Sequence, residues 1–94
     1  MRTEPVEIYA DTTNAAILRH PGRKFPGVLI QGDTLYSMCQ TLDWLCAKGR
    51  GKLDAEAYSE LNEFRNRLWL FLNGYKSTLE EHGIPLPFNE TPRT

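Results

Sequence analysis

Short runs of alternating apolar and polar residues in the first third of the chain predict β-strands. Residues 5–10 alternate in the strand period around Val6 and Ile8, and residues 15–19 and 27–31 form two further β-compatible runs. Between the last two runs, Pro21-Gly22 suits a type II turn because proline fixes φ and glycine accepts the positive φ that follows. We therefore expect two or three short strands in a mainly antiparallel sheet.

From residue 33 the apolar positions recur every three or four residues, which predicts two helices. Asp33 is the predicted N-cap of the first helix, and Gly49 is the predicted C′ residue just beyond its last turn. The second helix is predicted to begin after Asp54 as its N-cap and to run to His82, with Gly83 as its terminator. Both helices carry a broad apolar stripe that we expect to form the core: Leu35, Met38, Cys39, Leu42, Leu45 and Cys46 in the first, and Tyr58, Leu61, Phe64, Arg65, Leu68, Phe71, Leu72, Tyr75 and Leu79 in the second.

This order of elements predicts a small α+β domain of two layers, with two to three short antiparallel strands followed by two helices, the second long. A length of 94 residues allows one domain, which we expect over residues 1–88. Residues 84–88 are expected to lie extended over the core, and residues 89–94 are expected to form a frayed tail.

The net charge and the cysteines indicate which partners and which cellular compartment are compatible with the sequence. The formal net charge of −1 gives no overall field toward nucleic acid or an anionic membrane. Cys39 and Cys46 lie two helical turns apart, about 10 Å, which exceeds the roughly 7 Å limit for a disulfide. We expect both thiols to be free and buried in a reducing cytoplasm. The first residues resemble no signal peptide, and no apolar run approaches the length of a membrane span.

The predicted loop between the second and third strands carries four potentially cationic side chains: Arg19, His20, Arg23 and Lys24. Loops held by a rigid scaffold are frequent binding sites, and phosphate, nucleic acid or an acidic protein would suit this one. The alternative is a solvated hairpin tip. A nucleic-acid surface usually has more charge and more stacking aromatics than Phe25 supplies.

The run from residue 68 to residue 72 is apolar on every side of the second helix. Trp69 lies at the edge of the core stripe and Leu70 points nearly the opposite way, while Trp44 lies off the stripe of the first helix. Two explanations remain open. Either these side chains are covered within the chain, or Trp44, Trp69 and Leu70 face a partner or a second copy, as tryptophan often does.

Arg65 lies on the apolar stripe itself. Either its stem packs there while its charged head reaches water, or its guanidinium turns inward to a carboxylate such as Glu7, Asp11 or Asp43. The residues supply no catalytic, phosphate-binding, dinucleotide-binding or zinc-binding motif. We therefore expect no enzyme, no metal and no cofactor, and keep a small enzyme of unknown reaction as the third hypothesis.

The stretch from Arg23 to Leu35, with its Phe25-Pro26-Gly27 and Gly32-Asp33-Thr34, resembles the signature of a family of small bacterial proteins of unknown function. Residues 62–69 resemble a second segment of that family, Asn-Glu-x-Arg-Asn-x-Leu-Trp. The resemblance implies a bacterial or phage origin and a compact domain up to about residue 88, and it implies no activity, substrate or partner.

We therefore expect a protein-interaction module with a regulatory, immunity-type or inhibitor role, acting on a protein partner or by self-association. The alternative is an anion or nucleic-acid binder that works through residues 19–24.

Overall fold

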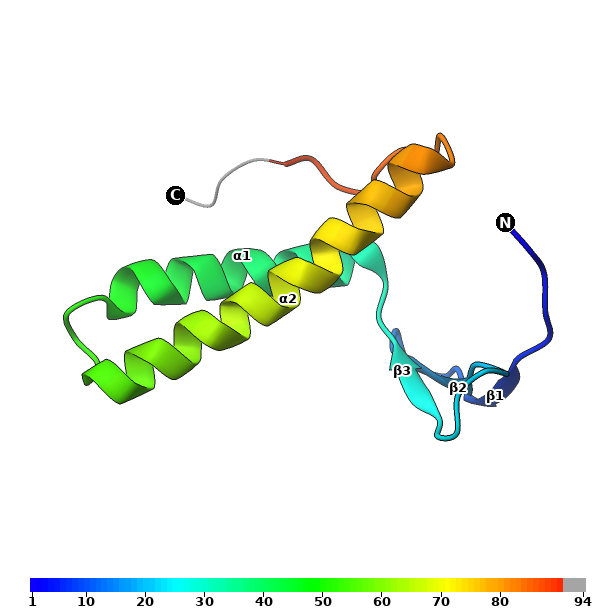
Figure 1. Ribbon diagram of the computed structural model, residues 1–94, viewed down its shortest axis with the longest axis horizontal. Coiled ribbons are helices and arrows are strands. Elements are labelled where there is room, and N and C mark those ends of the chain that lie inside the picture. The colour runs from blue at the N-terminus through cyan, green and yellow to red at the C-terminus, as the bar shows by residue number, and fades with distance from the viewer. Residues whose placement is uncertain (91–94) are drawn as a thin grey trace. The chain divides into compact units, whose positions relative to one another are not determined.

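The computed structural model describes residues 1–90 of the chain, which form three strands and two helices (Figure 1). The elements follow in the order β1 (Glu7–Ala10), β2 (Ala16–Arg19), β3 (Gly27–Leu29), α1 (Gly32–Gly49) and α2 (Ala55–Glu81). The predicted α+β class is confirmed, with antiparallel strands first and the longer helix last. The chain divides into two compact units: a sheet unit of residues 1–31, and a helical unit that begins at residue 32.

The sheet unit is a meander with the strand order β1-β2-β3. In the antiparallel register of β2 and β3, Ala16 lies opposite Leu29 and Ile17 lies opposite Val28. The pairing of β1 with β2 is irregular between Ile8 and Ala10, as expected for a bulge. No residue from 1 to 31 is buried, and the apolar side chains of all three strands are partly or largely exposed. The sheet therefore has no core of its own.

The helical unit is an antiparallel hairpin, in which α1 and α2 lie side by side and are joined by the short loop at residues 50–54 (Figure 1). Its core is narrow. The buried apolar side chains are Cys39, Leu42 and Cys46 on α1 and Leu72 on α2. Both cysteines are free and buried, as their spacing predicted.

The ends of α2 agree with the sequence signals. The carboxylate of Asp54 accepts a hydrogen bond of 2.8 Å from the amide of Ala57, so Asp54 is the N-cap. At the other end Gly83 has a φ of 65°, and the amide of Ile84 donates to the carbonyl of Leu79 at 2.9 Å. These are the features of a glycine-terminated Schellman motif, in which His82 is the C-cap.

Both predicted ends of α1 are wrong by one or two residues. The helix begins at Gly32, so Asp33 lies within the first turn, where its carboxylate accepts from the amide of Thr34 at 2.9 Å. Gly49 is still helical, and Gly51 takes the positive φ of 76° that ends the helix region. The cause is local: either glycine can terminate a helix, and the pattern alone does not choose between them.

The segment after α2 packs against α1, as the sequence predicted. The ring of Phe88 stacks on that of Tyr36 with centroids 4.2 Å apart, and Leu86 is half-buried. Glu90, which the sequence placed in the frayed tail, pairs with Lys76 at 2.7 Å. Residues 91–94, the rest of that predicted tail, lie outside the described residues.

Two glycines of the hairpin differ in their surroundings. A Cβ placed on Gly32 would overlap the ring of Tyr75, so this glycine leaves room for that ring against the start of α1. A Cβ on Gly74 would meet nothing within 4 Å. Close packing therefore accounts for Gly32 and not for Gly74.

Candidate functional site

The basic loop of the sheet unit uses two of its four predicted cationic groups to hold its own structure. The guanidinium of Arg19 pairs with Glu7 across the β1–β2 ladder, and its Nη1 donates to the carbonyl of Arg23 at 2.9 Å. This hydrogen bond to Glu7, and then the carboxylate charge, raise the pKa of Arg19. The ring Nδ1 of His20 accepts from the amide of Gly22 at 2.9 Å. Arg19 and His20 are thus structural parts of the loop.

Arg23 and Lys24 are the members of the predicted anion site that remain at the exposed tip. The ammonium of Lys24 lies 5.4 Å from the ring centre of Phe25, which is a cation–π distance. Of the predicted anion site, only these two exposed charged side chains therefore remain without a structural role in the loop, and they lie beside one exposed aromatic ring.

A polar cluster joins the two helices on one side of the hairpin. Asp43 on α1 accepts hydrogen bonds from the guanidinium of Arg65 and, at 2.9 Å, from the indole Nε1 of Trp69, both on α2. Of the alternatives for Arg65, the inward pairing with a carboxylate is the observed one, although both partners remain about one-third exposed. Asp43 thus fixes Trp69 within the hairpin.

Cys39 lies one turn before Asp43 and is fully buried. Burial raises the pKa of its thiol, the charge of Asp43 raises it further, and the charge of Arg65 partly offsets both. A buried thiol with a raised pKa is a poor nucleophile, because the thiolate is the reactive form. Cys39 is therefore a packing residue.

The three aromatic and apolar residues predicted to face a partner do not form one patch. Trp69 is half-buried and bonded to Asp43, while Leu70 is 69 % exposed. At about 100° per residue, Trp44 lies about 140° from Cys39 on α1, and Leu70 lies about 160° from Leu72 on α2. Trp44 and Leu70 therefore point away from the contact between the helices, in different directions.

One shallow groove involves two of these residues. It follows the outer side of α2 and is lined by Arg65, Asn66, Trp69, Leu70 and Asn73. Three of the lining side chains come from the segment 62–69 that resembled the family pattern. Among residues 1–90, no group of three or more His, Cys, Asp or Glu side chains is placed to hold a metal ion. Within the same range, neither helix is long and apolar enough to cross a membrane.

Four exposed apolar side chains lie on the side of the hairpin opposite the polar cluster. On α1, Met38 and Leu45 lie about 100° and 120° to one side of Cys39, whereas Asp43 lies about 40° to the other side. On α2, Phe64 and Phe71 lie about 80° and 100° from Leu72, on the side away from the residues that bind Asp43.

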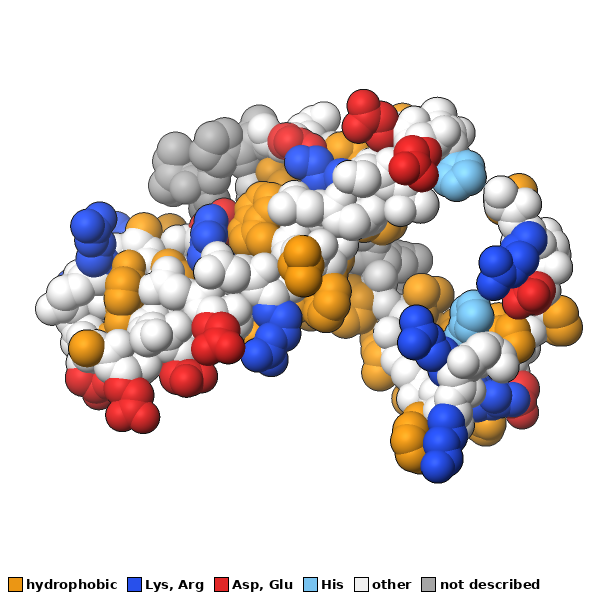
Figure 2. All heavy atoms as spheres, in the orientation of Figure 1, with side chains coloured by type: hydrophobic (Ala, Val, Ile, Leu, Met, Phe, Trp, Pro, Cys, Tyr) orange, Lys and Arg blue, Asp and Glu red, His pale blue; other side chains and the backbone are white. Residues whose placement is uncertain are grey.

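Because Asp43 contacts Arg65 and Trp69, the polar sides of the two antiparallel helices coincide, and so do their other sides. We define the apolar face as the four side chains on that second side: Met38 (40 % exposed), Leu45 (40 %), Phe64 (48 %) and Phe71 (57 %). In the space-filling view, hydrophobic side chains reach the surface of the helical unit between charged ones (Figure 2).

The contacts between the helices show which residues of α1 and α2 lie at the same level, that is, at the same height along the hairpin. Gly32 lies against Tyr75 near one end of the hairpin, and Gly49 lies beside Leu61 near the other. Between these points Leu45 is level with Phe64, and Met38 is level with Phe71. Each helix thus contributes one apolar side chain at each of two levels, which are separated by two turns.

Sequence reasoning placed these four residues in the core, and that prediction is wrong. Each helix has a broad apolar stripe, but it contacts only one neighbouring helix, which covers the centre of the stripe and leaves one edge open. The available signal was the width of the two stripes, since Phe64 and Phe71 lie beyond the arc that one neighbour can cover.

Comparisons with known proteins supply a family and no activity. No curated protein and no solved structure matches the chain. The model of one family matches residues 1–88, in agreement with the expected membership of a family of unknown function. The chain belongs to this family of unknown function, DUF6959.

Proposed function

We propose that the chain is a non-catalytic protein-interaction module that binds its partner through the apolar face of the hairpin. The observation that supports this most is the presence of four large apolar side chains, each 40 to 57 % exposed, on one side of two packed helices. Single exposed apolar residues are ordinary on protein surfaces, whereas contiguous patches are characteristic of binding sites.

The composition of the face suits a protein partner. Phenylalanine and methionine are enriched at protein interfaces, and an apolar helix face is a common recognition element. The polar cluster on the opposite side fixes how the two helices pack, so the face is formed before binding. A preformed surface lowers the conformational cost of association.

The setting that we propose is the reducing cytoplasm of a bacterial cell. Two free cysteines suit a reducing compartment, and the family resemblance of residues 23–35 is to bacterial proteins. The role would be regulatory, immunity-type or inhibitory, which are roles carried out by small binding modules.

Photo-cross-linking in the cell tests the proposal. Benzoylphenylalanine at position 71 replaces one aromatic side chain by another on the apolar face, and the same group at position 70 provides a control on the other side of α2. Irradiation is expected to give a protein adduct from position 71 and little from position 70. Equal adducts from both positions, or adducts from position 70 alone, would contradict the proposal.

The second candidate function, anion or nucleic-acid binding, is favoured only by the exposed pair Arg23 and Lys24 beside Phe25. It requires that binding to a polyanion weaken steeply with salt and that Arg23→Glu abolish it. Binding that is insensitive to salt, or equal in the Arg23→Glu variant, would exclude it.

A further inference from the structure

We propose that the occupant of the apolar face is a second copy of this chain, packed against it around a two-fold axis that runs parallel to the helices. This inference rests on the proposed function and names the partner. In this arrangement α1 of each copy lies against α2 of the other, and the four helices form an antiparallel bundle.

The levels of the four side chains fit this symmetry. A two-fold axis parallel to the helices keeps each residue at its own level and exchanges α1 with α2. Leu45 of one copy then meets Phe64 of the other, and Met38 meets Phe71, because the members of each pair share a level within the hairpin. Each helix contributes its two side chains seven residues apart, the spacing at which helices in bundles interdigitate.

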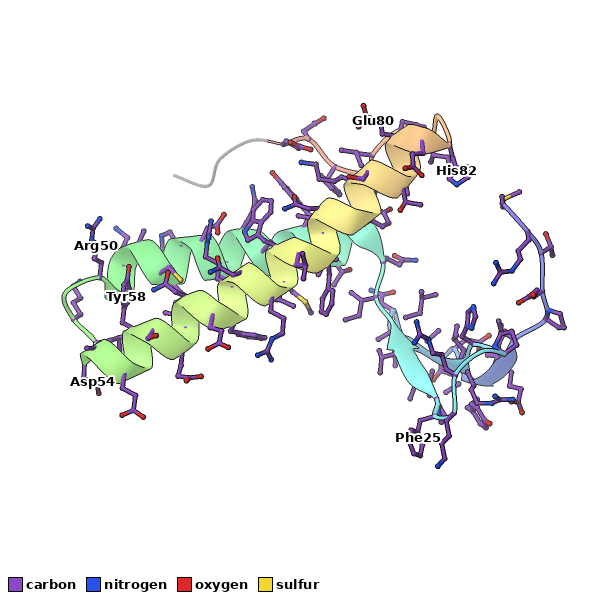
Figure 3. The ribbon with its side chains drawn as sticks, viewed as in Figure 1. Phe25, Arg50, Asp54, Tyr58, Glu80 and His82 are labelled. Atoms are coloured by element: carbon purple, nitrogen blue, oxygen red, sulfur yellow. The ribbon has the colours of Figure 1, made fainter. Side chains whose placement is uncertain are left out.

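The charges at the loop end of the hairpin are complementary under the same operation. The end of α1 and the following loop carry Lys48, Arg50 and Lys52, whereas the beginning of α2 carries Asp54, Glu56 and Glu60. Arg50 and Asp54 both lie at this end of the hairpin, Arg50 at the end of α1 and Asp54 at the beginning of α2 (Figure 3). The proposed axis places the basic end of each α1 beside the acidic beginning of the other copy's α2.

The part of α1 that borders the face carries no charge. Its polar residues there are Thr34 and Thr41, which lie about 140° and 160° from Cys39 on the same side as Met38. A second copy meets an apolar surface like its own, and the net charge of −1 makes the repulsion between copies small.

The size of the face places the dimer among the small interfaces. An 18-residue helix is about 27 Å long, and two packed helices are about 20 Å wide, so each copy contributes on the order of 500 Å². Two copies together bury about 1,000 Å², which is near the lower limit for a specific interface. We therefore expect a dimer that dissociates in the micromolar range.

Sedimentation equilibrium of the purified full chain tests the proposal with two matched variants, Phe71→Glu and Leu70→Glu. Both place a carboxylate on neighbouring residues of the same helix, and the more exposed Leu70 points away from the face. The wild type and Leu70→Glu are expected to be dimeric at about 100 µM, roughly a hundredfold above a micromolar Kd, whereas Phe71→Glu is expected to be monomeric. Circular dichroism checks that both variants keep their helices.

A monomeric wild type at that concentration overturns the inference, and so does a dimer that Phe71→Glu leaves intact. These results leave the proposed function standing if benzoylphenylalanine at position 71 still captures a different protein. The proposed function fails separately if position 71 captures nothing while position 70 does.

Disulfide trapping tests the arrangement of the two copies. A chain with Met38→Cys mixed with a chain carrying Phe71→Cys is expected to form a mixed disulfide faster than either chain forms one with itself. A two-fold axis that lies in the face but runs perpendicular to the helices would instead bring Phe64 of one copy against Phe71 of the other. Faster trapping between Phe64→Cys and Phe71→Cys chains would therefore overturn the proposed axis.

Discussion

The sheet unit and the helical hairpin contain similar kinds of apolar residues but bury them to different degrees. Ile8, Val28 and Leu29 of the sheet are each more than half exposed, and no residue from 1 to 31 is buried. In the hairpin, Leu72 and Cys39 are fully buried. The packing energy therefore resides mainly in the hairpin, because three short strands without a buried face are marginal by themselves.

The two units also hold their ion pairs differently. Arg19 and Glu7 pair across exposed strands of the sheet, where an ion pair contributes little. Asp43 is shared between Arg65 and Trp69 of the other helix, so it joins two elements. The hairpin therefore has a specified packing, and the surface that it leaves open is a defined one.

The largest expected effect is the removal of the buried centre of the hairpin. Leu72→Ala is expected to lower the free energy of unfolding by about 2–5 kcal/mol, because it removes a fully buried side chain and leaves a cavity. Val28→Ala in the sheet, at a position 60 % exposed, is expected to cost less than about 1 kcal/mol. Urea denaturation of both variants measures the difference. Equal losses of unfolding free energy would show that the sheet is packed as well as the hairpin.

The next largest effect separates two glycines within the hairpin. Gly32→Ala is expected to destabilise the chain by about 1–3 kcal/mol because the new Cβ overlaps the ring of Tyr75. Gly74→Ala, where the Cβ meets open space, is expected to stabilise α2 by about 1 kcal/mol. Thermal melts of the pair measure the opposite signs. If both variants were stabilised, the close approach at Gly32 would be wrong.

A smaller effect tests whether the polar cluster joins the helices. Asp43→Asn keeps the shape of the side chain but removes the negative charge of the carboxylate to which both Arg65 and Trp69 donate. The expected loss is about 1 kcal/mol, below the usual value for hydrogen bonds to a charged group because the pair is about one-third exposed. The matched control Glu63→Gln removes the exposed pair with Arg67 and is expected to cost about 0.2–0.5 kcal/mol. Chemical denaturation that gave equal losses would show that Asp43 is only a surface charge.

The smallest effect is a dependence of stability on pH. The raised pKa of the Cys39 thiol means that the folded chain keeps this proton at pH values where the unfolded chain has lost it. The free energy of unfolding therefore falls as pH rises above the unfolded thiol pKa of about 8.5, and this group has no effect well below it. Cys39→Ala is expected to reduce that slope. An unchanged slope in the variant, measured by denaturation across this pH range, would contradict the assignment.

The sequence predicted most accurately those features that are set by neighbouring residues. Asp54 and Gly83 bound α2 where the capping pattern placed them, because a cap depends on three or four consecutive residues. The same reasoning failed by two residues at Gly49, where a second glycine at position 51 was equally able to end the helix.

Features that depend on distant residues were predicted only as alternatives or were missed. Arg65 had three candidate carboxylates, and the packing of the helices selected Asp43. The contact of Gly32 with Tyr75 joins residues far apart in the sequence and left no local signal. The apolar face was missed for the same reason, since a helical stripe shows which side chains are apolar and does not show how many of them one neighbour covers.

Native-state hydrogen exchange of the full chain measures whether the hairpin, and not the sheet, contains the stable core. We expect amides near Cys39 and Leu72 to exchange only by global unfolding, and amides in β1, β2 and β3 to exchange much faster through local opening. Strand amides that exchange as slowly as those around Cys39 and Leu72 would contradict it, because the sheet would then belong to the same cooperative core.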